Sequence, residues 1–246
     1  MERMPESRAL VGIDVIGSAN TPGYHRKPLW DGLTGMLDTG LEQAGITPDD
    51  VLWQEPTGDG ALYTLTGDRL GAAFDLAAHL DRLARQHNRR YKPDIRLRIA
   101  VDRGPVGVEP GYYSPKIQLS RLINAPAFSA LLDCCLRERP ADAVHTGLIT
   151  SAEAFLDVFG GDYTTEVHQS EFAEISVSLK EFTDRVWVRV PGLDPRSLTE
   201  FARSIVPAAT EEPRVYHVQN VNNGTMTSSV QAGIVHGGIH LGGKRQ

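Results

Sequence analysis

Two aspartates near the start of the chain have surroundings typical of metal ligands. Asp14 ends a short apolar run, and Asp59 directly follows Gly58 in a turn-like segment. Carboxylates at strand ends next to glycine suit hard divalent cations, which take oxygen ligands and leave room for a phosphate. Aspartate is also common in turns for purely conformational reasons. Because the two aspartates share the same context, we favour the metal interpretation for both.

The elements that must position these aspartates are short strands. Residues 9–16 are an apolar run that ends at Gly17-Ser18, which predicts a buried strand followed by a turn. Residues 51–65 predict two strands around a hairpin tip at 56–60. Both aspartates are therefore expected at the ends of strands.

Helices and strands are also predicted for the rest of the first 195 residues. Apolar residues at helical spacing predict helices over 28–45, 70–86 and 119–136, and Ser151 is expected to cap a further short helix. Strands are expected at 95–101, 144–149, 175–179 and 186–190. This order predicts an α+β domain in which a sheet packs on helices.

The composition changes after this domain. We divide the chain into a patterned domain at 1–195, a polar linker at 196–213 and a tail at 214–246. Residues 215–243 contain no Asp, Glu, Lys or Arg. Such a segment cannot build a core alone, so it is either a disordered tail or a strand-forming assembly element.

Charge and cysteine content exclude several classes of function. The formal net charge is −6, and apart from Arg89-Arg90 and the last residues the chain has no basic stretch, so we expect neither nucleic-acid nor membrane binding. Cys134 and Cys135 are neighbours in a predicted helix and point apart, which favours buried thiols over a disulfide or a zinc site. The N-terminus has no apolar leader, and no segment has the length of a membrane span, so we expect a cytoplasmic protein.

Four segments of the chain resemble, in order, the motifs of class III nucleotide cyclases. Residues 13–18 resemble the first metal-binding strand of that family, and 55–60 resemble its second metal hairpin. Residues 96–106 resemble the following strand and turn, and 121–128 resemble the helix with the transition-state arginine. The pattern is closest to an actinobacterial branch, to which the pyrimidine cyclases of antiphage signalling are related. The resemblance implies a ferredoxin-like cyclase catalytic domain over 1–195.

The resemblance also implies a reaction and a set of site residues. A nucleoside triphosphate would be converted to a cyclic 3′,5′-nucleotide and pyrophosphate by two-metal catalysis with Mg²⁺ or Mn²⁺ in a homodimer. The implied residues are Asp14, Val15 and Asp59 for metal, Ile16, Gly17, Ser18, Arg98 and Lys180 for phosphate, and Arg121 for catalysis, typically from the partner subunit. For Arg98 and Lys180 the alternative is a solvated charge at a strand edge.

Three further residues are candidates for reading the base. Glu55 lies four residues before Asp59, where the family reads the base, and a carboxylate accepts hydrogen bonds from the N1–H and N2 amine of guanine. The alternative is an exposed glutamate in a turn. Tyr112 or Tyr113 can stack on any base, so the sequence leaves the nucleobase open.

One position departs from the family pattern. Ile117 stands four residues before Arg121, where the family has an asparagine that orients the ribose, and isoleucine cannot make that hydrogen bond. Two hypotheses follow. The chain is an active cyclase in bacterial signalling or antiphage defence, or it is a catalytically degenerate cyclase fold that binds a nucleotide or acts as a signalling scaffold.

The tail has a resemblance of its own. Residues 220–241 resemble a bacterial amyloid signalling motif whose Val-Gln-x-Gly core is similar to that of RIP-homotypic interaction motifs. Uncharged β-branched and Asn/Gln residues favour stacked in-register strands. The core positions are Val230, Gln231, Gly233 and Ile234. The resemblance implies homotypic assembly with other signalling proteins, and the alternative is a flexible extension.

A peptide of residues 214–246 should therefore form thioflavin-positive cross-β fibrils. Gln231→Asp should block growth, because it repeats one negative charge at every layer of the stack. Thioflavin fluorescence and fibre diffraction measure both outcomes. A wild-type peptide that stays monomeric, or an aspartate variant that fibrillises at the same rate, would reduce the tail to a flexible extension.

Overall fold

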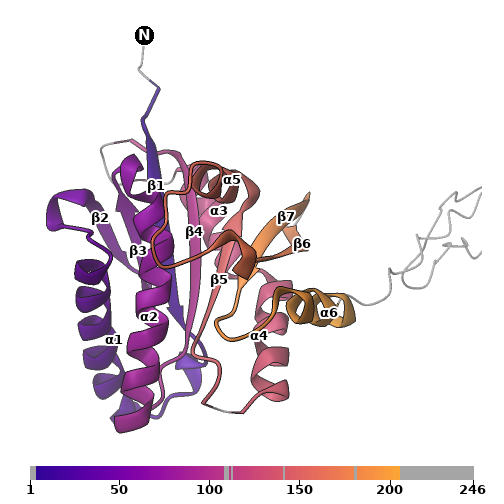
Figure 1. Ribbon diagram of the computed structural model, residues 1–246. Coiled ribbons are helices and arrows are strands. Elements are labelled where there is room, and N and C mark those ends of the chain that lie inside the picture. Colours follow the sequence, from indigo (N-terminus) through magenta and orange to yellow (C-terminus); the bar gives the residue numbers. More distant parts are fainter. Residues whose placement is uncertain (1–3, 108–110, 112, 141, 180–181, 206–246) are drawn as a thin grey trace, which may run out of the picture. The chain divides into compact units, whose positions relative to one another are not determined.

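Seven strands form one sheet in the order β2–β3–β1–β4–β5–β7–β6 (Figure 1). The computed structural model describes residues 4–107, 111, 113–140, 142–179 and 182–205. The strands are β1 (Ser7–Val15), β2 (Val51–Pro56), β3 (Gly60–Leu65), β4 (Leu97–Pro105), β5 (Thr146–Ser151), β6 (Ala173–Leu179) and β7 (Phe182–Arg189). The β4–β5 pair is parallel, and the other pairs of this described sheet are antiparallel.

The strand β1 lies at the centre of the part of the sheet that carries the aspartates. It pairs with β3 on one side and with β4 on the other. Ala9, Val11, Ile13 and Val15 enter the core on one face, whereas Leu10 enters the core on the opposite face. A strand that is buried on both faces must be apolar almost throughout, which explains the continuous apolar run in the sequence.

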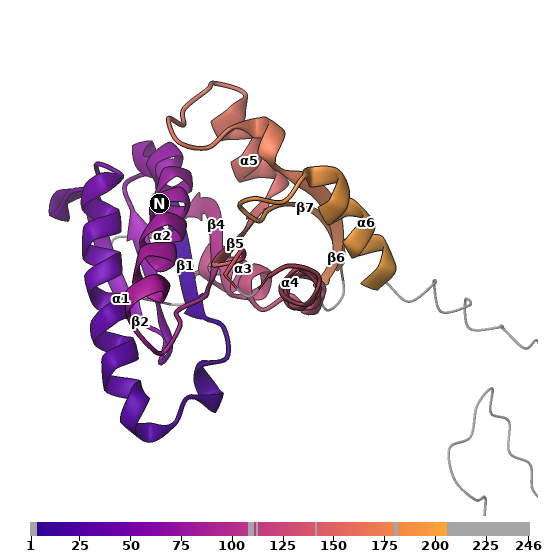
Figure 2. The ribbon, with the colours of Figure 1, turned by 60° about the horizontal axis from the view of Figure 1, so that its bottom comes forward.

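Helices cover both faces of the sheet (Figures 1 and 2). One face carries α1 (Gly23–Gln43), α2 (Leu70–Arg90) and α5 (Ala152–Phe159), whose apolar side chains share one core cluster. The other face carries α3 (Ser114–Ile123), α4 (Pro126–Glu138) and α6 (Pro195–Ile205), whose apolar side chains share the second cluster. Short 3₁₀ helices lie at Ser18–Asn20, Pro48–Asp50, Gly67–Arg69 and Gln169–Glu171.

The first half of the domain has a ferredoxin-like arrangement. The order of elements is β1–α1–β2–β3–α2–β4, the strands lie in the order β2–β3–β1–β4, and α1 and α2 pack together on the same face. The predicted α+β fold, with a sheet packed on helices, is confirmed. Ser151 caps α5 as expected, because its Oγ accepts a hydrogen bond from the amide of Ala154 at 3.2 Å.

The helix expected over residues 119–136 is two helices. It is interrupted at Asn124 and Ala125 because Pro126 disfavours a helical conformation in the residue before it. Pro126 then occupies the first position of α4, where its missing N–H costs nothing. The interruption ends α3 at Ile123, and Ile123 and Asn124 line the same pocket as the two aspartates.

The polar linker expected from residue 196 onward begins with a helix. The helix α6 places Leu198 fully inside the core (0% exposed), and Phe201 and Ile205 pack against the same cluster. Apolar residues at this spacing lie on one helix face, so α6 belongs to the domain. This is a correction to the linker boundary. The remainder of the linker and the tail, with Val230, Gln231, Gly233 and Ile234, lie outside the described residues.

One described segment, Ser114–Glu138, is long and apolar enough to cross a membrane by length and composition. Half of its apolar window is buried inside the domain. It also consists of α3 and α4, which line the second core cluster. We therefore interpret it as a pair of core helices.

Leu198→Ala should lower the free energy of unfolding by about 2–4 kcal/mol, because it leaves a cavity under α6. Leu156→Ala on α5 is the matched control, since Leu156 is 64% exposed, and it should change stability by less than about 0.5 kcal/mol. Urea denaturation of the full chain measures both. Equal effects would mean that α6 is not part of the folded domain.

Candidate active site

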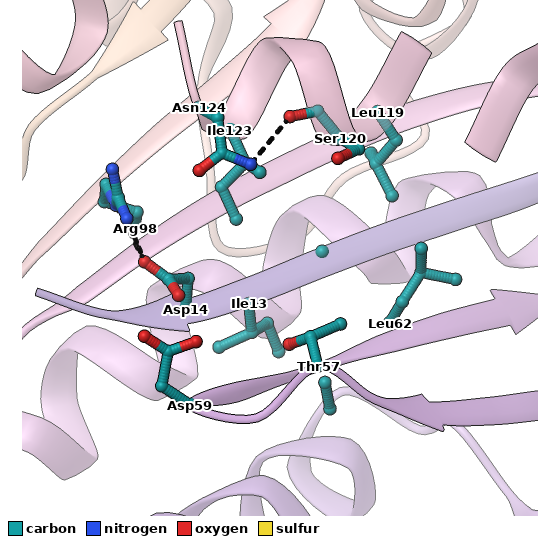
Figure 3. Close-up of a pocket in the computed structure, with 12 residues that line it drawn as sticks. Ile13, Asp14, Thr57, Asp59, Leu62, Arg98, Leu119, Ser120, Ile123 and Asn124 are labelled. Carbon is teal, nitrogen blue, oxygen red and sulfur yellow. Dashed lines mark hydrogen bonds and ion pairs between the residues drawn. The ribbon is translucent and has the colours of Figure 1, made fainter. Parts of the chain in front are cut away.

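Backbone packing brings the two aspartates together. The hairpin formed by β2 and β3 lies along β1 so that Gly60 is paired with Asp14. A Cβ atom on Gly60 would lie 1.8 Å from the carbonyl oxygen of Ile13, so only glycine allows this approach. Gly58 has a φ of +91°, which glycine adopts without strain and which turns the chain at the hairpin tip. Asp59, between the two glycines, thus faces Asp14 (Figure 3).

Each aspartate has a second partner within the site. The Oγ of Ser18 donates to Oδ2 of Asp59 at 2.5 Å. The Nε of Arg98, on β4, donates to Oδ2 of Asp14 at 2.9 Å, and its Nη1 donates to Oγ of Ser129 at 3.0 Å. The guanidinium of Arg98 therefore lies at the edge of the aspartate pair and is held in place by α4.

The two carboxyl groups titrate differently although they are neighbours. The pKa of Asp14 is raised to about 6, because burial and the neighbouring Asp59 raise it more than the hydrogen bond and charge of Arg98 lower it. Burial also raises the pKa of Asp59, but the hydrogen bonds from Ser18 and Asp14 outweigh it and hold that pKa below its usual range. The two partly buried carboxyl groups are hydrogen-bonded to each other, and below a pH of about 6 the proton that the pair binds resides on Asp14.

This pair has the chemistry of a magnesium or manganese site. Its donors are carboxylate and hydroxyl oxygens, which hard cations prefer. Within the described residues no group of three or more His, Cys, Asp or Glu side chains is placed to hold a metal. Mg²⁺ characteristically binds through one or two carboxylates and completes its shell with water and substrate phosphates. Asp14 and Asp59 fit that requirement, and a cation would compete with the protonation of Asp14.

A pocket of about 390 Å³ opens next to the aspartates (Figure 3). One side is polar, with Asp14, Asp59 and Arg98, and the opposite side is apolar, with Leu62 and Leu119. The remaining lining residues are Gly12, Ile13, Thr57, Ala61, Ser120, Ile123 and Asn124. The pocket thus joins a place for charged groups to a place for a flat apolar group, as nucleotide sites do.

The loop after β1 is partly available for binding phosphate. Gly17 has a left-handed φ of +77° and precedes the 3₁₀ helix at Ser18–Asn20. The amide of Ile16 already donates to the carbonyl oxygen of Arg96 at 2.8 Å, so Ile16 cannot use that amide for phosphate. The Val15 amide donates in the same way to the carbonyl oxygen of Asp59 at 3.1 Å. Only the carbonyl oxygen of Val15 can therefore serve as the candidate metal ligand at this residue. The backbones of Gly17 and Ser18 remain candidates for phosphate.

The described candidates for reading the base, Glu55 and Tyr113, do not line the pocket, but Glu55 is paired with Leu62, which does. The carboxylate of Glu55 forms an ion pair with Lys116 on α3, and the ring of Tyr113 lies next to the same lysine, 5.9 Å from Nζ to the ring centroid. Lys116 was not predicted from the sequence. Tyr112 and Lys180 lie outside the described residues.

The helix α3 faces the pocket with residues that the sequence interpretation did not select. Ser120 and Asn124 line the pocket, and the Asn124 amide donates to the carbonyl oxygen of Ser120 at 2.9 Å. Arg121 is half-buried and does not line this pocket. Ile117 is 43% exposed. Ile117, Ser120, Arg121 and Asn124 follow an i, i+3, i+4, i+7 spacing, which places them on one face of the helix. This spacing, counted from Arg121, is the sequence signal that could have identified Ser120 and Asn124 as pocket residues.

The domain is similar in fold to solved cyclases. The adenylate/guanylate cyclase/hydrolase from Silicibacter pomeroyi is 18% identical, with 78% of this chain and 100% of that chain covered and a TM-score of 0.52. A bacterial light-regulated adenylyl cyclase is 12% identical, with 83% of this chain and 58% of that chain covered and a TM-score of 0.51. No family model matches the chain, and no curated protein matches its sequence. At these identities the likeness shows the fold alone.

The titration of Asp14 makes a testable prediction. Because its folded-state pKa of about 6 is above the unfolded value, its contribution to stability is present at low pH and is lost as the pH rises through about 6. A divalent cation must displace the same proton. Mn²⁺ should therefore raise the melting temperature by about 3 °C at a pH near 7.5, and by much less at a pH near 5.

Asp14→Asn should remove this pH-dependent response to Mn²⁺, whereas Asp68→Asn, at a 70% exposed side chain outside the pocket, should leave it intact. Differential scanning calorimetry measures both. A response to Mn²⁺ that is the same at both pH values would contradict the metal assignment.

Proposed function

We propose that the domain is a nucleotide cyclase, which converts a nucleoside triphosphate to a cyclic 3′,5′-nucleotide and pyrophosphate. The observation that carries the proposal is the juxtaposition of Asp14 and Asp59, which are hydrogen-bonded to each other in a pocket that Arg98 also lines. The similarity in fold to solved cyclases supports it. A triphosphate fits the polar side, and the sugar and base extend over Leu62 and Leu119.

The reaction needs one bond to form and one to break. The ribose 3′-oxygen attacks the α-phosphorus, and its hydroxyl proton passes to solvent. The bond from the α-phosphorus to the oxygen that bridges the α- and β-phosphates breaks, and pyrophosphate leaves with the electron pair of that bond. Bound Mg²⁺ or Mn²⁺ would lower the pKa of the hydroxyl and neutralise the phosphate charge. Asp14, Asp59 and the carbonyl of Val15 would hold the ions.

Other residues of the chain bind and orient the triphosphate in this proposal. The backbone amides of Gly17 and Ser18, at the start of the 3₁₀ helix after β1, would donate hydrogen bonds to the phosphate oxygens. Arg98 is within reach of both the aspartates and the pocket, so it can turn from Asp14 to a phosphate oxygen without leaving the site. Lys180 is proposed as a second phosphate-binding cation.

We also propose that the enzyme is a homodimer with shared sites. Arg121 lies on the face of α3 that includes Ser120 and Asn124, yet it does not line the pocket of its own chain. A second copy of the chain would bring its Arg121 to the α-phosphate. The exposed Ile117 on the same face gives that contact an apolar centre.

A second candidate function has a specific observation in its favour. Arg98 pairs with Asp14, and Ile117 offers no hydrogen bond to a ribose, so the domain would bind a nucleotide without turning it over. In that case it serves as a scaffold whose output is assembly through the C-terminal motif. A role in bacterial signalling or antiphage defence is proposed for either function on the resemblance of the tail.

Incubation with each of the four nucleoside triphosphates and Mn²⁺, followed by mass spectrometry, should yield a cyclic nucleotide. Asp14→Ala and Asp59→Ala should each lower the yield by about a thousandfold or more, because each removes ligands worth several kcal/mol to the transition state.

The control for both variants is Asp68→Ala, which removes an exposed carboxylate and should keep full activity. Melting temperatures should show that all three variants are folded. If the wild-type protein binds a triphosphate but yields no cyclic product, the scaffold function replaces the cyclase. Unchanged yield in either aspartate variant would remove the metal role.

A further inference from the structure

A lysine on α3 lies almost fully buried, one turn before Leu119 of the pocket lining. Lys116 is 6% exposed, and its ammonium group pairs with Glu55 of β2. Lysine is rarely buried unless it is paired, because removing its charge from water is costly. The cyclisation chemistry proposed above makes no use of this group.

Lys116 joins two side chains that the sequence singled out separately. Its Nζ contacts the carboxylate of Glu55 and lies 5.9 Å from the centroid of the Tyr113 ring, within the range of a cation–π interaction. Glu55 is paired with Leu62, which lines the pocket, and Leu119 lies one turn after Lys116. The cluster of Glu55, Lys116 and Tyr113 therefore adjoins the apolar part of the pocket.

The cluster is held in a fixed arrangement. Lys116 binds Oε1 of Glu55, which leaves Oε2 available, and the Glu55 side chain is 43% exposed. The Tyr113 ring lies close to the backbone of Gly107, because a Cβ atom on Gly107 would lie 2.4 Å from the phenol oxygen. The lysine itself is too buried to meet a ligand, so it acts through Glu55.

We infer that Lys116 is a positioning residue for base selection, which fixes Glu55 as a carboxylate acceptor and favours guanine or uracil. This inference rests on the proposed function for the identity of the ligand. A carboxylate has no proton to donate, so the base must supply one. Guanine at N1 and uracil at N3 carry a ring N–H, whereas adenine and cytosine have a lone pair at the equivalent position. That lone pair would face the carboxylate and be repelled, which selects against those bases.

The test uses the four 3′-deoxynucleoside triphosphates, which lack the attacking hydroxyl and so report binding alone. Calorimetry on the full chain with Mn²⁺ should show that the wild-type protein binds the guanine or the uracil compound about tenfold or more tightly than the adenine and cytosine compounds. Lys116→Met should reduce this preference to about threefold or less, because Glu55 is then free to turn into solvent.

Two variants control this result. Lys116→Arg keeps a cation next to Glu55 and should retain the preference. Lys92→Met removes an ion-paired lysine whose side chain is 69% exposed and should also retain it. Lys116→Met is expected to fold, because methionine fills the same buried space and leaves the half-exposed Glu55 solvated. Glu55→Gln tests the same contact from the other side and should also lose the preference.

The outcomes separate this inference from the proposed function. If Lys116→Met weakens all four compounds equally and keeps their ratio, the lysine is structural and the inference is wrong. A wild-type preference for adenine or cytosine overturns the assigned base class. Selective binding without any turnover of the natural triphosphates overturns the cyclase and leaves the role of Lys116 intact. No binding of any compound overturns both.

Discussion

The structure of the site depends on one unfavourable interaction, the proximity of the partly buried carboxyl groups of Asp14 and Asp59. Two neighbouring carboxylates repel each other, and this repulsion is offset by the backbone that fixes them, by the hydrogen bonds from Arg98 and Ser18 and, below a pH of about 6, by a proton on Asp14. The fixing element is the packing of Gly60 against the carbonyl of Ile13, which leaves no space for a side chain. The hairpin, the central strand and the pocket are all arranged around this contact.

Much of the fold could be predicted from the sequence, because the first four strands are marked by local patterns of apolar and turn-forming residues. The apolar run of β1 and the glycine-containing turn before β3 identified the strand ends that carry the aspartates. The division between α3 and α4 was missed because the apolar spacing continues across Pro126, although the proline itself was the signal. The helix α6 was missed because its polar composition masked the spacing of Leu198, Phe201 and Ile205. The order of β5, β7 and β6 depends on contacts between distant residues, which local patterns do not encode.

For a similar reason, only some residues of the candidate site could be identified from the sequence. Asp14 and Asp59 carry their signal in the adjacent glycines, so each could be recognised from a few residues. Lys116 carries none, because its partner Glu55 lies 61 residues away and only folding brings the two together. The engagement of the Ile16 amide with the carbonyl of Arg96 likewise depends on the pairing of β1 with β4. Sequence reasoning thus finds residues whose role is set by their neighbours in the chain, and misses those whose role is set by their neighbours in space.

The position of α6 has a consequence for anything attached to the domain. This helix packs on α4 and β6, and β6 is the edge strand opposite to β2. Four strand spacings separate β6 from β1, on the order of 19 Å at about 4.8 Å each. The last described residue, Ile205, therefore lies next to an edge of the sheet that contributes no residue to the pocket, so a substitution or a fusion at this end of the described domain would leave the pocket lining unchanged.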